Sequence, residues 1–338
     1  MKMSELNNIA LKIIGNGKGI LAADESTGTM TKRLENVKVD SSAKNRLLFR
    51  ETLFSSTSMK DCIGGVILYD ETIKQTCLSG KKIPELILDS NAVPGIKVDT
   101  GAKNLANSPE EKITEGLDGL RERLKEYYKL GARFAKWRGV YTISEKYPSK
   151  LSIYSNAHAL ARYSALVQES GMVPIVEPEV LMDGNHSSED CFQKTSEVIK
   201  KCYEQLELHK VELKGTILKP NMVLPGSNSK EKIDTLKIAE MTIKCLKESV
   251  PSEVPGIAFL SGGQTEKEAT KNLNQINVKN ETNFIMTYSY GRALQQGALK
   301  FWSKDLKNIK GTQEVFNHRA KMCSLASKGE WSEEVDKI

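Results

Sequence analysis

Residues that commonly bind metals are scarce in this sequence, and their spacing argues against a metal site. There are only four histidines among 338 residues, and none is arranged as H-x-H or H-E-x-x-H, the spacings typical of zinc enzymes. The six cysteines form no C-x-x-C pair. A chain of this length does not depend on a disulfide scaffold, so we expect reduced cysteines and a cytoplasmic location. The expected chemistry uses no metal or other cofactor.

Long apolar runs and signal-like segments are also missing. No apolar run reaches the ~20 residues that span a bilayer, and Met1-Lys-Met-Ser-Glu5 leads into no apolar core of a signal peptide. No low-complexity segment or flexible linker divides the chain, so we expect one domain over residues 1–338, with a short N-terminal helix and a tail from about residue 328. The net charge of +6 is dispersed, which suits small anionic substrates better than nucleic acid or a membrane.

Short apolar strands alternate with helical stretches along the chain. Strands are predicted over residues 19–24, 65–69, 95–99, 133–138, 173–177, 216–219, 256–261 and 284–288. Helices are predicted over residues 7–14, 42–54, 117–130, 153–169, 190–208, 233–250, 265–273 and 292–302. About eight strands that alternate with helices predict an α/β fold, a single (β/α)8 TIM barrel. An open doubly wound sheet is the alternative, although no G-x-G-x-x-G follows the first strand.

Polar side chains occupy the ends of these predicted strands. Side chains alternate along a strand with a period of two, so Phe134, Lys136 and Arg138 share one face of the fourth strand. Barrel enzymes carry their chemistry at the C-terminal ends of the strands. One mouth of the barrel would then gather Asp24, Lys97, Lys136, Arg138, Glu177, Lys219 and Ser261. So many polar groups at one mouth are costly unless a ligand uses them.

Lys219 is the most informative of these residues. It ends the apolar run 216–218, and Pro220, which has no N–H, stops the strand behind it. Burial disfavours the charged form of a lysine, and the like charge of a nearby Lys136 would add to that effect. A partly neutral amine can attack a carbonyl and form a Schiff base. The alternative is a lysine that extends from the strand end to water.

Two glycine-containing loops follow the seventh and eighth predicted strands. Ser261-Gly-Gly-Gln264 and Ser289-Tyr-Gly-Arg292 each lead into a predicted helix, where free N–H groups and the helix dipole favour an anion. Barrels commonly bind phosphate at these two loops. A second set of polar and basic residues is expected across the mouth: Ser26, Thr29, Lys32, Arg33, Lys97 and Arg138. The sequence therefore offers sites for two phosphate groups.

Eight segments, in order along nearly the whole chain, are long enough to compare with known families. They are LAADESTG (21–28), CIGGVIL (62–68), GIKVD (95–99), FAKWR (134–138), VPIVEPE (173–179), LKPNMV (218–223), FLSGGQ (259–264) and SYGRAL (289–294). They resemble the motifs of eukaryotic class I fructose-1,6-bisphosphate aldolase. The resemblance implies a (β/α)8 barrel, usually a homotetramer, that reversibly cleaves fructose 1,6-bisphosphate to dihydroxyacetone phosphate and glyceraldehyde 3-phosphate in glycolysis and gluconeogenesis. Sedoheptulose 1,7-bisphosphate and fructose 1-phosphate are implied as further substrates.

The resemblance also implies roles for individual residues. Lys219 matches the Schiff-base lysine, and Glu177 matches the acid/base, whose pKa we expect burial to raise. Lys136 and Asp24 match catalytic partners that position hydroxyls and tune the proton transfers. The ketose-phosphate pocket is matched by Ser261, Gly262, Gly263, Ser289, Gly291 and Arg292. The other end of the site is matched by Ser26, Thr29, Arg33, Lys97 and Arg138.

The C-terminal part departs from the family pattern. The family's tail ends in a tyrosine that reaches the active site, whereas Tyr290 is the last tyrosine here. The departure leaves open how the product enamine is protonated and which ketose phosphate is preferred. We expect the polar residues after Lys328 to be mobile. Two other functions compete: a different Schiff-base lyase, such as a transaldolase or a sedoheptulose 1,7-bisphosphate aldolase, and a basic scaffold that bundles acidic filaments.

Overall fold

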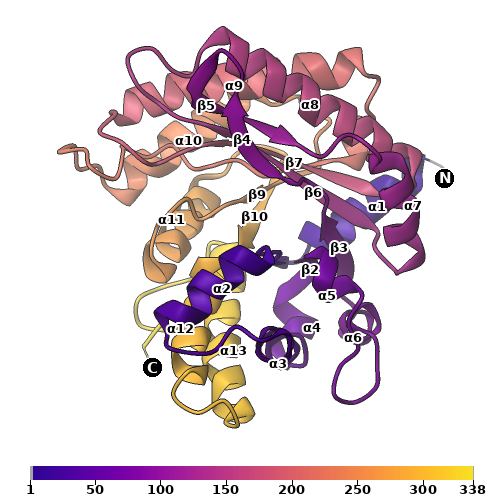
Figure 1. The fold of residues 1–338 in the computed structure, drawn as a ribbon. Coiled ribbons are helices and arrows are strands. Elements are labelled where there is room, and N and C mark those ends of the chain that lie inside the picture. Colours follow the sequence, from indigo (N-terminus) through magenta and orange to yellow (C-terminus); the bar gives the residue numbers. More distant parts are fainter. Residues whose placement is uncertain (1–2, 338) are drawn as a thin grey trace.

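The eight central strands close into a parallel barrel (Figure 1). The computed structural model describes residues 3–337. The barrel strands are β1 (Gly19–Ala23), β2 (Ile63–Leu68), β3 (Val93–Lys97), β6 (Phe134–Tyr141), β7 (Val173–Val180), β8 (Ile217–Leu218), β9 (Gly256–Phe259) and β10 (Ile285–Tyr290). They pair in chain order, and β10 pairs with β1 to close the ring. The predicted TIM barrel is confirmed, and each of the eight predicted strands overlaps one of these.

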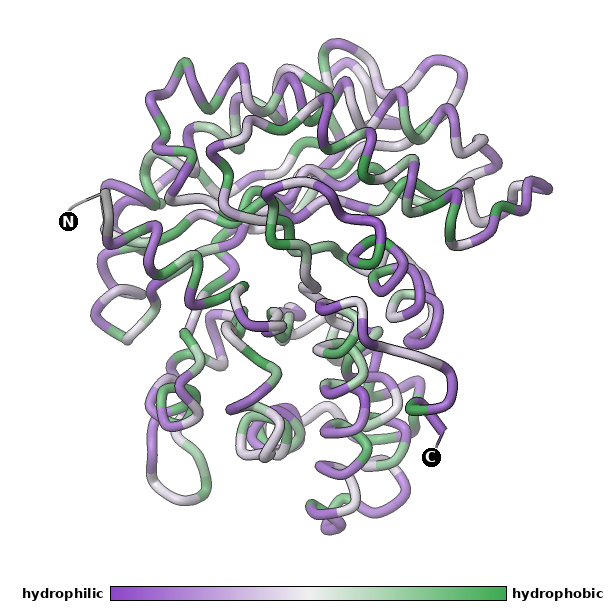
Figure 2. The backbone as a smooth tube through the Cα atoms, turned by 180° about the vertical axis from the view of Figure 1, so that it is seen from behind, coloured by the Kyte–Doolittle hydropathy of each residue, from purple (hydrophilic) through white to green (hydrophobic). Residues whose placement is uncertain are grey.

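Helices surround the barrel, and their apolar sides face inward (Figure 2). They are α1 (Met3–Ile14), α2 (Thr27–Asn36), α3 (Ala43–Phe54), α4 (Ser58–Cys62), α5 (Asp70–Ile73), α6 (Ile83–Asp89), α7 (Leu120–Lys129), α8 (Lys150–Glu169), α9 (Ser188–Leu208), α10 (Thr235–Ser249), α11 (Glu266–Lys279), α12 (Arg292–Trp302) and α13 (Ile309–Ala326), with a 3₁₀ turn at Leu213–Gly215. The eight predicted helices are all present. Helices α2, α4, α5, α6 and α13 were not predicted, and α4 to α6 span too few turns to show a clear hydrophobic period.

An antiparallel hairpin, also not predicted, lies outside the barrel between β3 and α7. Its strands are β4 (Gly101–Leu105) and β5 (Ser108–Glu115). Three consecutive residues of β4 are exposed, so the sequence lacks the apolar alternation that marks a half-buried strand.

Apolar side chains fill the barrel, and α1 closes the end at which the strands begin. Phe134, Ile175 and Ile217 lie in one buried cluster together with Ile13 and Ile14 of α1. A side chain at Gly64, near the start of β2, would meet the Ile13 carbonyl at 1.9 Å, so only glycine permits this close approach. The strand face that carries Phe134 therefore points into the barrel, as the period of two predicted. The opposite end of the barrel is left for polar groups.

The residues after α13 pack against the protein. Trp331 is buried and its backbone N–H donates to Asn274 Oδ1 of α11 at 2.9 Å. Asp336 accepts hydrogen bonds from His318 Nε2 at 2.9 Å, from Arg319 and from the Trp331 indole. The expectation of a mobile tail is therefore wrong for residues 331–336, because the tail contains an apolar anchor and a buried carboxylate with several donors. Ile338 lies outside the described residues.

Candidate active site

A cavity of about 880 Å³ opens at the C-terminal ends of the strands. Side chains from seven of the eight strand ends line it, which places it at the face where barrel enzymes carry their chemistry. Every predicted site residue lines this cavity: Asp24, Ser26, Thr29, Arg33, Lys97, Lys136, Arg138, Glu177, Lys219, Ser261, Gly262, Gly263, Ser289, Gly291 and Arg292. The structure thus brings together residues that are spread over almost 270 positions of sequence, and it excludes none of them.

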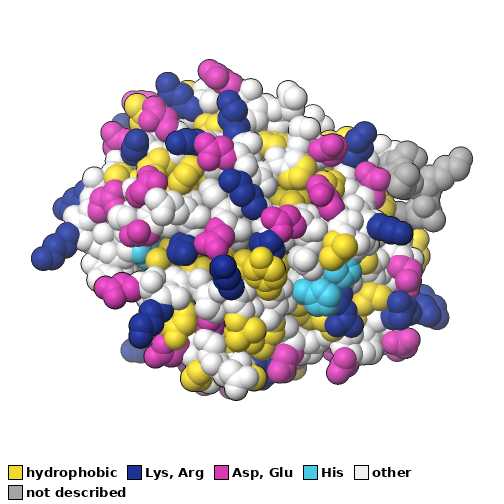
Figure 3. Space-filling view, turned by 90° about the horizontal axis from the view of Figure 1, so that it is seen from above, with side chains coloured by type: hydrophobic (Ala, Val, Ile, Leu, Met, Phe, Trp, Pro, Cys, Tyr) yellow, Lys and Arg dark blue, Asp and Glu magenta, His cyan; other side chains and the backbone are white. Residues whose placement is uncertain are grey.

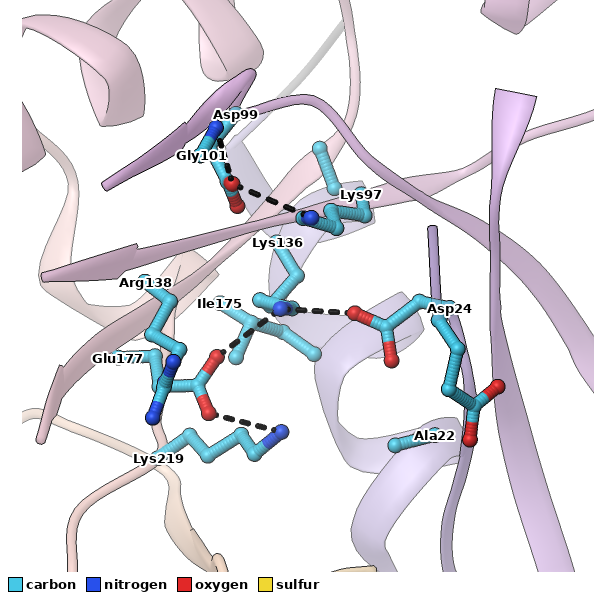
Figure 4. A network of polar contacts seen from close by, with 12 residues as sticks. Ala22, Asp24, Lys97, Asp99, Gly101, Lys136, Arg138, Ile175, Glu177 and Lys219 are labelled. Atoms are coloured by element: carbon cyan, nitrogen blue, oxygen red, sulfur yellow. Dashed lines mark hydrogen bonds and ion pairs between the residues drawn. The ribbon is translucent and has the colours of Figure 1, made fainter. Parts of the chain in front are cut away.

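Two lysines and two carboxylates form a connected network on the inner surface of the cavity (Figure 4). Lys136 Nζ lies 2.7 Å from Asp24 Oδ2 and 3.2 Å from Glu177 Oε2. Lys219 Nζ lies 3.0 Å from Glu177 Oε1. Glu177 therefore touches both lysines, one through each carboxylate oxygen. Lys136, Glu177 and Lys219 are only 3–4% exposed, so their charges interact with little screening by water.

The strand register produces this contact. Lys136 of β6 is paired in register with Ile175 of β7, and Arg138 is paired with Glu177. Ile175 is in turn paired with Ile217 of β8, two residues before Lys219. Because side chains alternate along each strand, Lys136, Glu177 and Lys219 all point into the mouth. Pro220 follows directly and ends β8, as predicted.

The network governs the protonation of its members. Burial would raise the pKa of Asp24, but the charges of Lys136 and Lys219 outweigh burial and hold that pKa well below its usual range. Burial would lower the pKa of Lys136, but Asp24 and Glu177 raise it strongly. Lys136 is therefore a permanent cation near neutral pH, and Asp24 is a permanent anion.

The pKa of Glu177 shifts in the direction opposite to the prediction. We expected burial to raise its pKa, and burial does act in that direction, but the charges of Lys136, Lys219 and Arg138 outweigh it and lower the pKa. The expectation of a raised pKa is wrong for this state of the site, because it considered burial without the two lysines. Glu177 is thus an ionised carboxylate here, ready to accept a proton from an amine or a hydroxyl.

Two further carboxylates, Asp99 and Glu179, form ion pairs with the cavity-lining residues Lys97 and Arg138. Lys97 Nζ lies 3.4 Å from Asp99 Oδ1. Arg138 Nε donates to Glu179. Burial would lower the pKa of Arg138, but the charge of Glu179 outweighs burial and raises that pKa. Asp99 and Glu179 were not among the predicted site residues. The period of two would have found both, since each follows a predicted site residue, Lys97 or Glu177, by two positions.

Two loops offer positions for an anion on one side of the cavity. Gly262 and Gly263 have φ values of +55° and +86°, a backbone conformation that glycine adopts without strain. The Thr265 side chain caps the first turn of α11, and Glu268 completes the predicted capping box. Gly291 precedes α12 without any side-chain cap, so the first N–H groups of α12 remain for a ligand. Ser289 Oγ is buried and has no hydrogen-bond partner among the described residues.

Helix α2 supplies polar groups on another part of the wall. Ser26 caps α2 by accepting a hydrogen bond from the Thr29 backbone N–H, and its hydroxyl lies 3.1 Å from that of Thr29. Lys32 and Arg33 also line the cavity from this helix. Glu25, which sequence reasoning did not select, lines it too and pairs with Arg33. A substrate with an anionic group at each end would find hydrogen-bond donors at both.

Residues 3–337 contain neither a cluster of metal ligands nor a membrane-spanning helix. No group of three or more His, Cys, Asp or Glu side chains is placed there to hold a metal ion. Among those same residues no helix has the length and apolarity needed to cross a membrane. All six cysteines are buried and unpaired with one another.

The chain is similar to proteins of one family. The family described as "Fructose-bisphosphate aldolase class-I" matches residues 5–338. A "Probable fructose-bisphosphate aldolase class 1" from Xylella fastidiosa (strain 9a5c) is 48% identical over 332 residues, which cover 98% of this chain and 99% of that protein. "Fructose-bisphosphate aldolase 4, cytosolic" from Arabidopsis thaliana is 49% identical over 314 residues, covering 93% and 80%. A solved structure of the Plasmodium falciparum fructose-bisphosphate aldolase, in complex with TRAP and a small-molecule inhibitor, aligns with a TM-score of 0.96 at 44% identity, covering 98% of this chain and 96% of that one.

Proposed function

The chain belongs to the class I fructose-bisphosphate aldolase family, and on that premise we propose that Lys219 forms the Schiff base and that Glu177 moves the protons. The observation that carries the assignment is the 3.0 Å contact between Lys219 Nζ and Glu177 Oε1 at a buried strand end. Family membership supports the cleavage of fructose 1,6-bisphosphate; that the reaction needs no metal, and the roles of the residues, are our proposal.

The first steps use the Lys219–Glu177 pair. Lys219 transfers a proton to Glu177, the neutral amine attacks the C2 carbonyl of the ketose, and a proton moves from the attacking nitrogen to the oxygen to give the carbinolamine. Protonated Glu177 then gives its proton to the carbinolamine hydroxyl, which leaves as water and produces the iminium ion. Lys136 remains protonated beside this pair because the negative charge of Asp24 stabilises its cationic form. Lys136 in turn stabilises the carboxylate that Glu177 regains, from which it lies 3.2 Å away.

Carbon–carbon cleavage follows from the iminium ion. Glu177 accepts the proton of the C4 hydroxyl, the C3–C4 bond breaks, and its electron pair moves to the iminium nitrogen to give an enamine. The aldehyde fragment departs as glyceraldehyde 3-phosphate. Protonation of the enamine at C3 and hydrolysis release dihydroxyacetone phosphate and restore Lys219. Asp24 and Lys136 position the substrate hydroxyls in these steps.

We assign the two phosphate groups to the two parts of the cavity wall. The ketose phosphate takes the N–H groups at the start of α12, the buried Ser289 hydroxyl and the Arg292 guanidinium, supported by the uncapped helix. Gly262, Gly263 and Ser261 complete that pocket. The other phosphate binds near Arg33, Ser26 and Thr29, with Lys97 and Arg138. Sedoheptulose 1,7-bisphosphate and fructose 1-phosphate are proposed as further substrates, the second lacking the group that Arg33 would bind.

We also propose that the chain is a single domain that assembles as a homotetramer in the cytoplasm. The supports are the family resemblance and the relatives named as cytosolic. The face over α8 and α9 carries interspersed positive and negative charges with apolar side chains between them (Figure 3). Its exposed apolar residues include Leu151, Tyr154 and Leu208. Light scattering after gel filtration should give about four times the chain mass of 37.6 kDa; a single-chain mass would rule out the tetramer.

Kinetics of two glutamate variants test the assignment of the acid/base. Glu177 and Glu179 lie on the same face of β7 and are both at most 8% exposed, but only Glu177 touches Lys219. We expect Glu177→Gln to lower kcat for fructose 1,6-bisphosphate by roughly 10²–10⁴-fold, the usual contribution of a general acid/base. Glu179→Gln is the matched control and should act mainly on KM through Arg138. Equal losses of kcat in both variants would remove Glu177 from its proposed role.

A further inference from the structure

Glu25 is a cavity-lining carboxylate that the cleavage mechanism does not use. It follows Asp24 directly, and its side chain is only 10% exposed. Arg33 Nη1 donates to Glu25 Oε1, and Gln295 Nε2 approaches the same oxygen at 3.4 Å. Arg50 Nη2 lies 3.5 Å from Glu25 Oε2. One carboxylate therefore joins two arginines, of which Arg33 lines the cavity.

Arg33 has two further donors that no residue between 3 and 337 accepts. Its side chain is 11% exposed, and its Nε and Nη2 atoms are buried without a hydrogen-bond partner among the described residues. Buried guanidinium donors without partners are costly. One nitrogen of Arg33 is bound to Glu25, and a turn of the side chain toward the cavity would present the two remaining donors to an anionic ligand.

Arg50 lies behind this pair and is fixed in place. It is 1% exposed, its Nη1 donates to Thr72 Oγ1 at 2.7 Å, and its Nη2 donates to the Glu25 carbonyl at 2.9 Å. Arg50 thus holds both the backbone and the carboxylate of Glu25. If Arg33 turned to another anion, Glu25 would keep a cationic neighbour and would not be left as an uncompensated charge.

We propose that Glu25 is an internal competitor for the second phosphate of a bisphosphate substrate, and that it thereby sets the preference between bisphosphates and monophosphates. With a monophosphate bound, the Arg33–Glu25 pair stays intact. A bisphosphate takes Arg33 from Glu25, while Arg50 and Gln295 keep the carboxylate. Part of the binding free energy of the second phosphate is then used to break the internal pair. The inference rests on the proposed phosphate site at Arg33.

The test compares two substrates in each variant. The readout is the ratio of kcat/KM for fructose 1,6-bisphosphate to kcat/KM for fructose 1-phosphate. We expect Glu25→Gln to raise this ratio about two- to fivefold, since a side-chain ion pair contributes up to about fivefold in binding. An effect on neighbouring Asp24 would change both substrates alike and would cancel in the ratio. Glu25→Asp, which withdraws the carboxylate from Arg33 by one methylene, should raise the ratio in the same direction.

Two further variants separate the possible failures. Glu71→Gln is the matched control, because Glu71 approaches Arg50 at 4.0 Å without lining the cavity; its ratio should equal that of the native protein. Arg33→Ala should lower the ratio. If Arg33→Ala lowers the ratio but neither Glu25 variant raises it, Glu25 is not a competitor and the inference fails. If Arg33→Ala leaves the ratio unchanged, the proposed phosphate site itself is wrong. A change in the Glu71→Gln ratio as large as that in Glu25→Gln would also overturn the inference.

Discussion

Replacing Lys136 with methionine should destabilise the protein in a way that depends on pH. Lys136 is 4% exposed and joins Asp24 at 2.7 Å to Glu177 at 3.2 Å. Removing one partner of a buried charge pair usually costs ~3–5 kcal/mol of unfolding free energy, because the other charge is left uncompensated. Lys219 still neutralises Glu177 at 3.0 Å, so Asp24 carries most of the loss. We expect a destabilisation of ~3 kcal/mol at pH 7.

The size of the thermal shift follows from chain length. Unfolding entropy is about 2.1 cal/mol/K per residue, which for 338 residues gives about 0.7 kcal/mol/K. A loss of ~3 kcal/mol should therefore lower Tm by about 4 °C. Circular dichroism melts of native protein and Lys136→Met, recorded in parallel at each pH, would measure it.

The pH dependence of the Tm difference distinguishes a loss of charge compensation from a loss of packing. In the native protein the pKa of Asp24 is lowered, since Lys136 and Lys219 outweigh burial; its stabilising effect is complete above its unfolded pKa of ~3.9 and is lost as pH falls below that value. In Lys136→Met, burial should instead raise the Asp24 pKa, so that its ionisation destabilises the fold as pH rises. The Tm difference should therefore shrink between pH 7 and pH 4.5, and D24N should restore part of the loss. A difference that stays constant over this range, or no loss at pH 7, would refute the reasoning.

Four other outcomes are expected. Arg292→Ala should raise KM for fructose 1,6-bisphosphate by an amount that corresponds to ~1.5–3 kcal/mol, the usual contribution of hydrogen bonds to charged groups; unchanged kinetics would remove Arg292 from the site. Cleavage should survive EDTA, and a loss that zinc restores would contradict a lysine mechanism. Deleting residues 331–338 should leave cleavage within a few-fold but lower Tm, because Asp336 and its ion pair with Arg319 are lost; a roughly hundredfold loss of kcat, about 2.7 kcal/mol of barrier, would show that the tail acts in catalysis. Burial alone would raise the pKa of Asp336, but the hydrogen bond from His318 and the charge of Arg319 outweigh burial and lower that pKa. The Tm difference between the native protein and D336N should therefore be complete above the unfolded pKa of ~3.9 and disappear as pH falls below that value.

The mouth of the barrel was predictable because strand geometry is regular. A period of two placed Lys136, Glu177 and Lys219 on inward faces, and the barrel topology brought their strand ends together. The lowered pKa of Glu177 was not predictable from its burial, since it depends on two lysines that approach within 3.2 Å.

Contacts between helices and loops that are far apart in the sequence could not be predicted from it. Arg50 binds the carbonyl of Glu25 and the hydroxyl of Thr72, which lie 25 and 22 residues away, and no local period connects these positions. Asp336 is held by donors from α13 in the same way. Such contacts are set by how helices pack, and a single sequence carries no spacing that encodes that packing.

Trapping of the covalent intermediate tests the central claim most directly. The protein would be incubated with dihydroxyacetone phosphate and borohydride, digested, and its lysine-containing peptides mapped by mass spectrometry. We predict a reduced adduct on Lys219 and none on Lys136, which stays protonated between Asp24 and Glu177. An adduct on another lysine, or no adduct under conditions in which fructose 1,6-bisphosphate is cleaved, would contradict the assignment of Lys219 as the nucleophile.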